Sequence, residues 1–421
     1  MMTNAAWIAL LAVLTGPPPA GGNWPEFRGP SGNGHSSITG LPLKWSESEN
    51  VTWKTSVHGT GWSSPVIWGD QIWMTTAENK GKELYAVCID RRSGKIVHDI
   101  KLFEVAEPGR KNPLNSYASP TPVIEAGRVY ITFGTYGTAC LDTKTGKTIW
   151  SRRDINCDHD MGPGVSPIAY GSLLIMPMDG CDVQYIIALD RKTGKTVWKT
   201  NRGIDYSKVQ YDTRKAFCTP IVIEVSGQKQ LIAPCAHAII AYNPDTGEEL
   251  WKISIAPGFS IIPRPVFANG MLFVVTDCSR PQLWALKPTV KGGKPTATIA
   301  WKVKKNAPQR SSLMLTGGLI YGMTHRGYIV CFEAKTGKTV WTKRIGNAFS
   351  ASPIYADGRI YIFNERQGTT VIQPGRTYKE LATNKFGRSR IMASPAIAGK
   401  AIFLRTDTHV YRIEKKTAGK Q

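Results

Sequence analysis

One eight-residue pattern recurs along this chain and constrains its fold more than any other feature. It reads TKTGKTIW at 143–150, RKTGKTVW at 191–198, PDTGEELW at 244–251 and AKTGKTVW at 334–341. Directly before the second copy, Asp190 can accept hydrogen bonds from nearby amides, and within the copy Gly194 can adopt the positive φ of a tight turn. Trp198 follows on the next strand. The pattern predicts one hairpin repeated in several copies of a single structural unit.

A second element precedes each hairpin, namely a Ser-Pro pair or a variant of it followed by apolar residues. Eight copies begin at positions 63, 118, 165, 218, 263, 311, 351 and 393. The first five prolines, at 65, 120, 167, 220 and 265, lie about 45 to 55 residues apart, as in β-propeller blades. Within the unit at 166–200, strand and turn signals alternate four times. The sequence therefore predicts an all-β, eight-bladed propeller of four-stranded antiparallel blades.

The two ends of the chain are expected to meet in the last blade. The eighth unit ends at HVYRIEKKTAGKQ (409–421), before any fourth strand, whereas NVTWKTSV (50–57) reads as an outer strand. We expect this N-terminal strand to close the ring and remove the exposed sheet edges. A blade cannot bury both faces alone, so the outer-strand tryptophans should fill the space between neighbouring blades. These docking positions are Trp53, Trp150, Trp198, Trp251, Trp301 and Trp341.

The segment from Ala188 to Trp198 resembles the A-L-D-x-x-T-G-K-x-x-W signature of the pyrroloquinoline-quinone-type (PQQ-like) β-propeller repeat. The resemblance covers 51–416, and NWPEFRGPSGNGHS (23–36) is similar to the N-terminal arm of secreted bacterial members. It implies the fold of quinoprotein dehydrogenases and of a propeller lipoprotein in outer-membrane barrel assembly. The expected organisation is a signal peptide at 1–20, an arm at 21–50, the propeller at 51–416 and a tail at 417–421.

Charge and the N-terminal residues bear on location. The chain has 53 Lys and Arg against 31 Asp and Glu, a net charge of +22, without any run of five or six basic residues. The apolar run at 5–14 is too short to span a bilayer but suits a secretory signal, so we expect export to the periplasm or the extracellular space. Export would separate the protein from most nucleic acid, and no nucleic-acid partner or transmembrane segment is predicted.

The cysteines fit the repeat better than a disulfide framework. Cys88, Cys140 and Cys331 stand two residues before the turn acid or its replacement, where Ala188 stands in another copy, and should be buried core residues. Of the other five, Cys157 and Cys181 form one candidate bridge. No zinc, Walker-type or nucleophile-elbow motif is present, and we predict no metal site and no catalytic residue.

Propeller topology brings particular loops to one face. Loops that enter a first strand and loops between second and third strands emerge together around the central channel, and their residues are rich in arginine. Such a mouth would attract an anionic ligand and hold carboxylates or phosphates. The candidates are Trp62, Tyr117, His159, Asp160, Arg214, Lys215, Arg264, Arg310, Arg326, Arg366, Arg388 and Arg390.

Three functions remain open. The first is an exported, monomeric binding or scaffold module for an envelope protein, an anionic small molecule or a polysaccharide, with no cofactor. The second is a quinone-dependent dehydrogenase holding PQQ and calcium. The resemblance implies a vicinal cysteine pair in such enzymes, and no two cysteines are adjacent here. The third is recognition of carbohydrate or an acidic polymer through Trp62, Tyr117 and the arginines.

Overall fold

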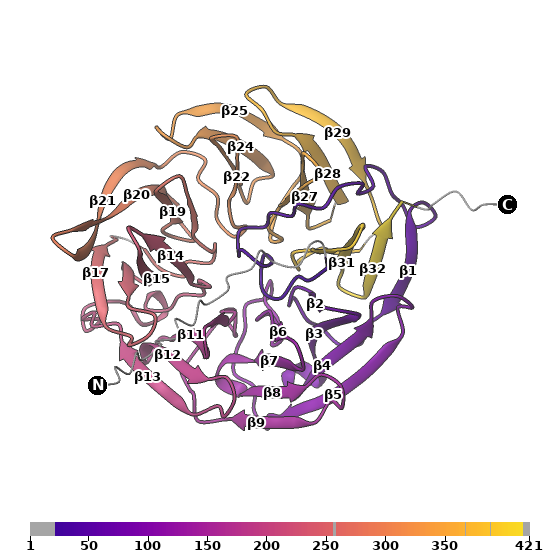
Figure 1. The fold of residues 1–421 in the computed structure, drawn as a ribbon, viewed down its shortest axis with the longest axis horizontal. Helices are drawn as coiled ribbons and strands as arrows, with labels where there is room; N and C mark the ends of the chain where they lie inside the picture. Colours follow the sequence, from indigo (N-terminus) through magenta and orange to yellow (C-terminus); the bar gives the residue numbers. More distant parts are fainter. Residues whose placement is uncertain (1–21, 256–257, 367, 388, 416–421) are drawn as a thin grey trace, which may run out of the picture.

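The computed structural model describes residues 22–255, 258–366, 368–387 and 389–415. Its strands form eight four-stranded sheets, arranged as the blades of one ring (Figure 1). Within each blade the strands are antiparallel neighbours, as in the pairing of β10 (Ile168–Tyr170) with β11 (Leu173–Asp179). The predicted eight-bladed propeller is confirmed. The proposed signal peptide (1–20) and tail (417–421) lie outside the described residues.

From the channel to the rim, the strands of each blade follow the chain order, except that the outermost strand of the last blade comes from the N-terminal end of the propeller. Blades 1 to 4 comprise β2 (Val66–Trp68), β3 (Gln71–Glu78), β4 (Glu83–Asp90), β5 (Ile96–Glu104); β6 (Val123–Glu125), β7 (Arg128–Thr132), β8 (Thr138–Asp142), β9 (Thr148–Arg152); β10, β11, β12 (Gln184–Asp190), β13 (Thr196–Asn201); and β14 (Ile221–Val225), β15 (Gln228–Cys235), β16 (Ala238–Tyr242), β17 (Glu249–Ser254).

Blades 5 to 8 continue the same order. They comprise β18 (Val266–Ala268), β19 (Met271–Val275), β20 (Leu283–Lys291), β21 (Lys294–Val303); β22 (Met314–Thr316), β23 (Leu319–Met323), β24 (Tyr328–Glu333), β25 (Thr339–Arg344); β26 (Ile354–Ala356), β27 (Arg359–Asn364), β28 (Gly368–Gln373), β29 (Lys379–Asn384); and β30 (Ala396–Ala398), β31 (Ala401–Arg405), β32 (His409–Glu414), β1 (Val51–Ser56). Three short 3-10 turns complete the elements: η1 (Asn79–Gly81), η2 (Gly134–Tyr136) and η3 (Tyr211–Thr213).

The last blade joins the two ends of the chain. Strand β1 pairs antiparallel with β32, with Lys54 opposite Tyr411, so the blade order is β30, β31, β32, β1. The predicted closure by the N-terminal strand is therefore confirmed. Figure 1 shows the indigo β1 beside the yellow β32. A ring closed in this way leaves no first or last blade with an unpaired face.

The T-G-K turn and the tryptophan of the repeat meet across blade boundaries. The Trp150 indole N–H donates to the carbonyl of Arg191 in the next blade's turn, at 2.9 Å. Gly194 of that turn has φ +71°, and a Cβ there would come within 2.6 Å of the Trp150 ring. Trp198 and Gly247 repeat this arrangement one blade later. The repeat therefore encodes the contact between blades as well as the hairpin.

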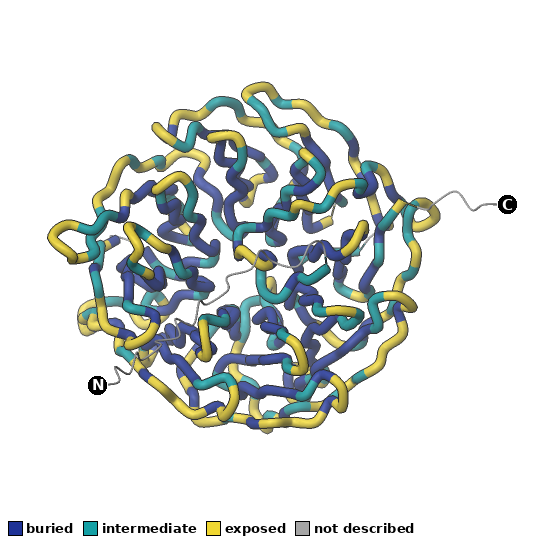
Figure 2. The backbone as a smooth tube through the Cα atoms, viewed as in Figure 1, coloured by how far each residue is buried: buried dark blue, intermediate teal, exposed yellow. Residues whose placement is uncertain are grey.

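Other tryptophans follow the same rule, with one exception. Trp53, Trp301 and Trp341 also donate to carbonyls in the turn of the following blade. Trp251 precedes the blade that has a long β20–β21 hairpin without the T-G-K turn, and it bonds to Gln230 of its own blade instead. The middle strands are buried while turns and much of the rim are exposed (Figure 2).

The cysteines lie within the described residues, and all eight are free thiols. Cys88, Cys140 and Cys331 are buried in β4, β8 and β24, which confirms their predicted place in the core. The candidate bridge between Cys157 and Cys181 is not formed, and both residues are buried as free thiols.

Residues 23–45 of the N-terminal arm cover one end of the channel. Trp24 exchanges two backbone hydrogen bonds with Ile67 of blade 1, both at 2.8 Å, and the Pro25 carbonyl accepts from Ile124 of blade 2. Further along, the Gly34 carbonyl accepts from Tyr355 of blade 7. These partners all lie on innermost strands, and Figure 1 shows the indigo segment crossing the middle of the ring. The arm therefore closes the channel on the side of the short inner hairpins.

Candidate ligand-binding site in the central channel

A ring of hydroxyl groups surrounds the channel. The residue two positions before each innermost strand is Ser or Thr in seven blades, and each side-chain oxygen accepts a hydrogen bond from the backbone N–H of the equivalent residue in the preceding blade, at 2.8–3.2 Å. We call these seven residues the hydroxyl collar: Ser64, Thr121, Ser166, Thr219, Ser312, Ser352 and Ser394. In blade 2 the equivalent proline is Pro122, which directly precedes β6, rather than Pro120.

The collar has hydrogen-bonding capacity left over. Every member is at least 95% buried and lines the cavity, and each oxygen accepts one backbone N–H. None of these hydroxyls donates to a protein acceptor within the described ranges. A hydroxyl has one donor and two lone pairs, so each keeps a donor and a lone pair for a molecule in the channel.

Arg264 occupies the eighth position of the ring. Arg264 has no hydroxyl, so the backbone N–H of Thr219 has no partner in the collar. The Arg264 guanidinium reaches the arm instead. It donates to the Phe27 carbonyl at 2.6 Å, the Glu26 carboxylate at 2.9 Å and the Pro220 carbonyl at 3.1 Å. Arg264 is 4% exposed. Its expected place at the open mouth is thus corrected: it lies at the closed end, because it belongs to the ring rather than to a loop.

Arg28 strengthens the same closure. It is 2% exposed and donates to the carbonyls of Asn33 and Leu313, at 2.5 and 2.7 Å. Burial, together with the nearby charge of Arg264, lowers the pKa of Arg28 to about 9. Its Nε and Nη1 are buried without a partner among the described residues. The closed end thus combines Arg28 and Glu26 of the arm with Arg264 of blade 5.

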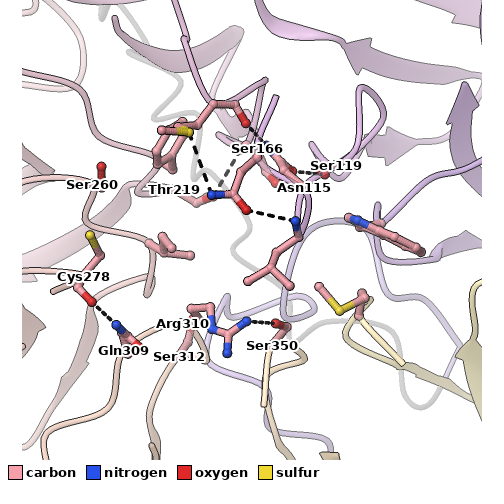
Figure 3. A pocket seen from close by; sticks show the side chains of 18 of the residues that line it. Asn115, Ser119, Ser166, Thr219, Ser260, Cys278, Gln309, Arg310, Ser312 and Ser350 are labelled. Carbon is pink, nitrogen blue, oxygen red and sulfur yellow. Dashed lines mark hydrogen bonds between the residues drawn. The ribbon is translucent and has the colours of Figure 1, made fainter. Parts of the chain in front are cut away.

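Above this closed end lies a cavity of about 550 Å³. Phe27 of the arm, the collar and the entry loops line it, and its polar wall is drawn in Figure 3. Apolar lining comes mainly from Leu114, Met161, Phe217, Phe259, Ile262 and Met392. Pockets of this size that combine apolar walls with a few fixed polar groups are typical of small-molecule sites.

Two arginines share one carboxylate at the open end. The Glu365 side chain, 7% exposed, accepts from Arg310 at 2.9 Å and from Arg390 at 3.2 Å. Ser350 donates to the same carboxylate at 2.7 Å, and the Arg390 guanidinium lies 5.8 Å from the Trp62 ring centre. One carboxylate between two guanidinium groups leaves one net positive charge at the rim. We call Arg310, Glu365 and Arg390 the mouth triad.

Arg310 connects this triad to the cavity. It lines the cavity and uses Nη1 for both of its protein bonds, one to Ser350 (Figure 3) and one to Glu365. Its Nε and Nη2 donate to no acceptor in the part of the chain that the structure describes. These nitrogens form the planar fork that binds carboxylates and phosphates in bidentate geometry.

The entry segment of blade 4 carries a second cation, and its ammonium donors are engaged within the protein. Lys215 is 1% exposed, lines the cavity and donates to Asp160 at 2.8 Å and to the Asp212 carbonyl. Gln309, which directly precedes Arg310, donates to the Cys278 carbonyl (Figure 3). Lys215 therefore has its donors engaged, whereas Arg310 keeps unused donors at the cavity.

The structure brings only some of the predicted mouth residues to the cavity. Trp62, Lys215 and Arg310 line it, and Asp160 and Arg390 contact lining residues. Arg326 and Arg366 are exposed on the loops after β23 and β27. Arg388 lies outside the described residues.

Three candidates lie away from the cavity. His159 is buried and accepts from the Thr135 amide, and burial lowers its pKa to about 4. Arg214 folds back onto the Val209 carbonyl. Tyr117 donates to the Gly109 carbonyl and lines a separate groove of about 480 Å³ beside η1. The hydroxyl collar was missed as a site, although the recurring Ser-Pro element marks most of its members.

The lining residues do not fit the quinone cofactor and metal of the dehydrogenases. Calcium takes six to eight oxygen ligands, several of them carboxylates. Asp212 is the one acidic residue that lines the described cavity, and no group of three or more His, Cys, Asp or Glu among the described residues could hold a metal ion. No two cysteines are adjacent to cover a planar cofactor.

Comparison with known proteins agrees with this architecture. The family model described as "Outer membrane protein assembly factor BamB" matches residues 46–202 and 183–421, nearly all of the propeller. The chain belongs to this family. The resemblance to PQQ-like propellers is thereby confirmed. No helix in the described part of the chain is long and apolar enough to cross a membrane.

Solved structures of different function share the fold of this family member. BamB from Moraxella catarrhalis has a TM-score of 0.61 and 12% identity, covering 86% of this chain and 99% of that one. A europium-containing methanol dehydrogenase has a TM-score of 0.64 and 11% identity, covering 91% and 89%. At such identities the likeness shows the fold alone.

One curated relative matches over a shorter stretch. The lupanine 17-hydroxylase [cytochrome c] of a Pseudomonas species is 24% identical over 174 residues, which is 39% of this chain. The chain matches only 23% of that relative's length. Since one fold carries an assembly factor and a dehydrogenase, function must be argued from the site.

Proposed function

We propose that this protein is a binding module whose channel mouth receives an anionic group of a small ligand or of a partner protein. One observation carries the proposal: the mouth triad has one unmatched positive charge beside a cavity whose collar hydroxyls have donors left. Arg310 supplies the nitrogens that face this cavity. An anion entering here would find donors already in place, so little reorganisation would oppose binding.

The single open end supports binding rather than passage. Glu26, Phe27 and Arg264 hold the arm against the far end of the channel. A ligand would enter and leave through the mouth, and the buried collar would remove water from the part that is bound. Hydrogen bonds to charged groups gain strength where water is excluded.

The exposed basic residues would raise the rate of association with a ligand or partner rather than the final affinity. Arg326 and Arg366 are exposed on loops of the same face as Arg310. Exposed charges raise the rate at which an oppositely charged partner arrives, and salt screens them. Arg310, which is 19% exposed in its side chain, should depend less on salt.

We also propose export to the periplasm or the extracellular space, with an envelope protein or an acidic polysaccharide as the partner class. The apolar run at 5–14 and the name of the matching family support this proposal. We propose a monomer, because the blades are closed into one ring without a free sheet face.

Isothermal titration tests the proposal directly. The protein is titrated with polygalacturonate and with inorganic phosphate at 50 and 300 mM salt, beside the variant Arg310→Gln and the control Arg326→Gln. We expect saturable binding, a loss of about tenfold for Arg310→Gln, and a smaller loss for the control. Binding that is equal for both variants would contradict the proposal.

The same titration includes the dehydrogenase alternative. PQQ with calcium is added to the protein, followed by an alcohol and an artificial dye. Saturable PQQ binding with dye reduction would make the channel an active site and overturn the binding-module proposal. Binding of an anion without dye reduction would agree with the binding module.

A further inference from the structure

The hydroxyl collar bears on ligand chemistry in a way that the mouth triad alone does not. A simple anion offers acceptors only, and Arg310 with two or three donors would satisfy it. Seven hydroxyls spread around the whole channel offer seven donors and seven lone pairs in addition. A ligand that uses them must carry groups around its perimeter that both donate and accept.

Sugar hydroxyls have this property. Each sugar O–H can accept from a collar hydroxyl and donate to the free lone pair of the next one. The apolar lining residues, such as Phe217 and Phe259, would contact the C–H faces of a sugar ring. The volume of about 550 Å³ suits a ligand of one or two sugar rings.

The charge of the cavity adds a second requirement. Arg310 presents unused nitrogens, while Lys215 is matched by Asp160 at 2.8 Å. The Trp62 indole nitrogen is buried without a partner in the described structure, beside Arg390. These donors lie on one side of the cavity, so the ligand should carry its negative charge at one edge.

We propose that the cavity binds the end of an acidic saccharide, with sugar hydroxyls on the collar and the carboxylate on Arg310. This inference rests on the proposed function and specifies its ligand as a sugar ring that bears one carboxylate, as in a hexuronic acid. The closed end limits the site to the terminal one or two residues of a chain.

Titration of the full chain with three probes tests the ligand class without any variant. The probes are digalacturonate, the neutral disaccharide maltose and acetate. Charged hydrogen bonds add about tenfold or more in affinity over neutral ones, so digalacturonate should bind at least tenfold tighter than maltose. Acetate lacks the sugar ring and should bind at least tenfold more weakly than digalacturonate.

Two variants separate the collar from the triad. Thr219→Val keeps the side-chain shape but removes one collar hydroxyl, and should weaken both sugars by about threefold to tenfold. Its control is Thr148→Val, at an exposed position on β9. Arg310→Gln should weaken digalacturonate about tenfold and maltose much less, because maltose has no carboxylate. Unfolding curves establish that each variant is folded, and the probe series on the unmodified chain stands even if one is not.

The outcomes of these titrations distinguish failure of the sugar inference from failure of the proposed function. Equal binding of acetate and digalacturonate would overturn the sugar inference but leave the proposed anion-binding module intact. Equal binding of maltose and digalacturonate would overturn the requirement for a carboxylate. If neither polygalacturonate nor phosphate nor digalacturonate binds in a way that depends on Arg310, the proposed function fails together with this inference.

Discussion

The two ends of the central channel use arginine in opposite ways. At the closed end, Arg264 and Arg28 are at most 4% exposed and bond to the arm and to backbone carbonyls. At the open end, Arg310 and Arg390 are 19% and 17% exposed in their side chains and share one carboxylate. The first pair holds the chain together, whereas the second has donors left for another molecule.

The position of each arginine within the repeat explains why the two ends of the channel differ. Charge and loop position are similar in Arg264 and Arg310, since each lies just before an innermost strand. What separates them is the repeat position: Arg264 directly precedes Pro265, where other blades have the collar hydroxyl, and Arg310 lies two residues before that position. A departure from the repeat at a buried position thus marks a structural contact.

The largest effect should follow Arg264→Ala. Removing one partner of a buried ion pair costs about 3 to 5 kcal/mol of unfolding free energy, because Glu26 is left without its cation. Urea unfolding measures the loss. Arg264→Ser should lose about 1 kcal/mol less unfolding free energy than Arg264→Ala, because the new hydroxyl can accept a hydrogen bond from the Thr219 N–H and complete the ring.

The matched control lies at the open end. Arg326→Ala removes an exposed arginine and should change stability by less than about 0.5 kcal/mol. A similar loss for Arg264→Ala and Arg326→Ala would contradict the distinction between the two ends.

The next effect concerns the collar itself. Ser312→Ala removes the acceptor of the Arg264 amide, which is 3.0 Å away and buried. An unsatisfied buried amide costs about 1 to 3 kcal/mol. Ser350→Ala, which removes a partly exposed hydroxyl that donates to Glu365 of the mouth triad, should cost less than half as much in the same urea experiment. Equal losses would indicate that the collar hydroxyls do not hold the blades together.

Much of the fold could be predicted from sequence because the repeat encodes a contact between its own copies. Gly194 packs on Trp150 and Gly247 packs on Trp198, so the same letters specify turn, strand and blade boundary. Ring closure by β1 followed from a missing strand at one end and an extra strand at the other. These features depend on pattern and topology, which a single sequence contains.

The site could be predicted only in part, because loop conformation decides where a side chain goes. Topology placed Lys215 and Arg310 correctly on the wall of the cavity. It could not foresee that Arg214 turns back to the Val209 carbonyl or that Tyr117 packs beside η1. The collar had a visible signal, but its serines looked like turn residues until the ring of hydrogen bonds was known.

Acidification should loosen the closed end. The Nε2–H of His35 in the arm donates to the Leu315 carbonyl at 2.7 Å, and burial lowers the pKa of His35 below the usual value. A lowered histidine pKa leaves stability complete above the unfolded value of about 6.5 and reduces it as the pH falls toward the folded value. The hydrogen-exchange protection factors of residues 23–45, which correct for the intrinsic pH dependence of amide exchange, should therefore fall between pH 7.5 and pH 5.

His35→Asn is the control for this pH dependence. The amide can still donate a hydrogen bond but does not titrate, so the protection factors of the arm should fall much less below pH 6.5 in this variant. An arm that loosens equally in both proteins would assign the effect to other groups.

The smallest effect on stability, and the sharpest contrast between the ends, is expected for Arg366→Gln. This exposed residue follows Glu365 directly but takes no part in the ion pairs of the mouth triad within the described structure, so the unfolding free energy should change by less than about 0.5 kcal/mol. Its charge should instead act at a distance, raising the association rate of a polyanion at low salt. Stopped-flow mixing with polygalacturonate at 50 and 300 mM salt measures this rate. A slower association at 50 mM that converges with the unmodified protein at 300 mM would assign Arg366 to steering, whereas a faster dissociation at both salts would place it in direct contact with the ligand.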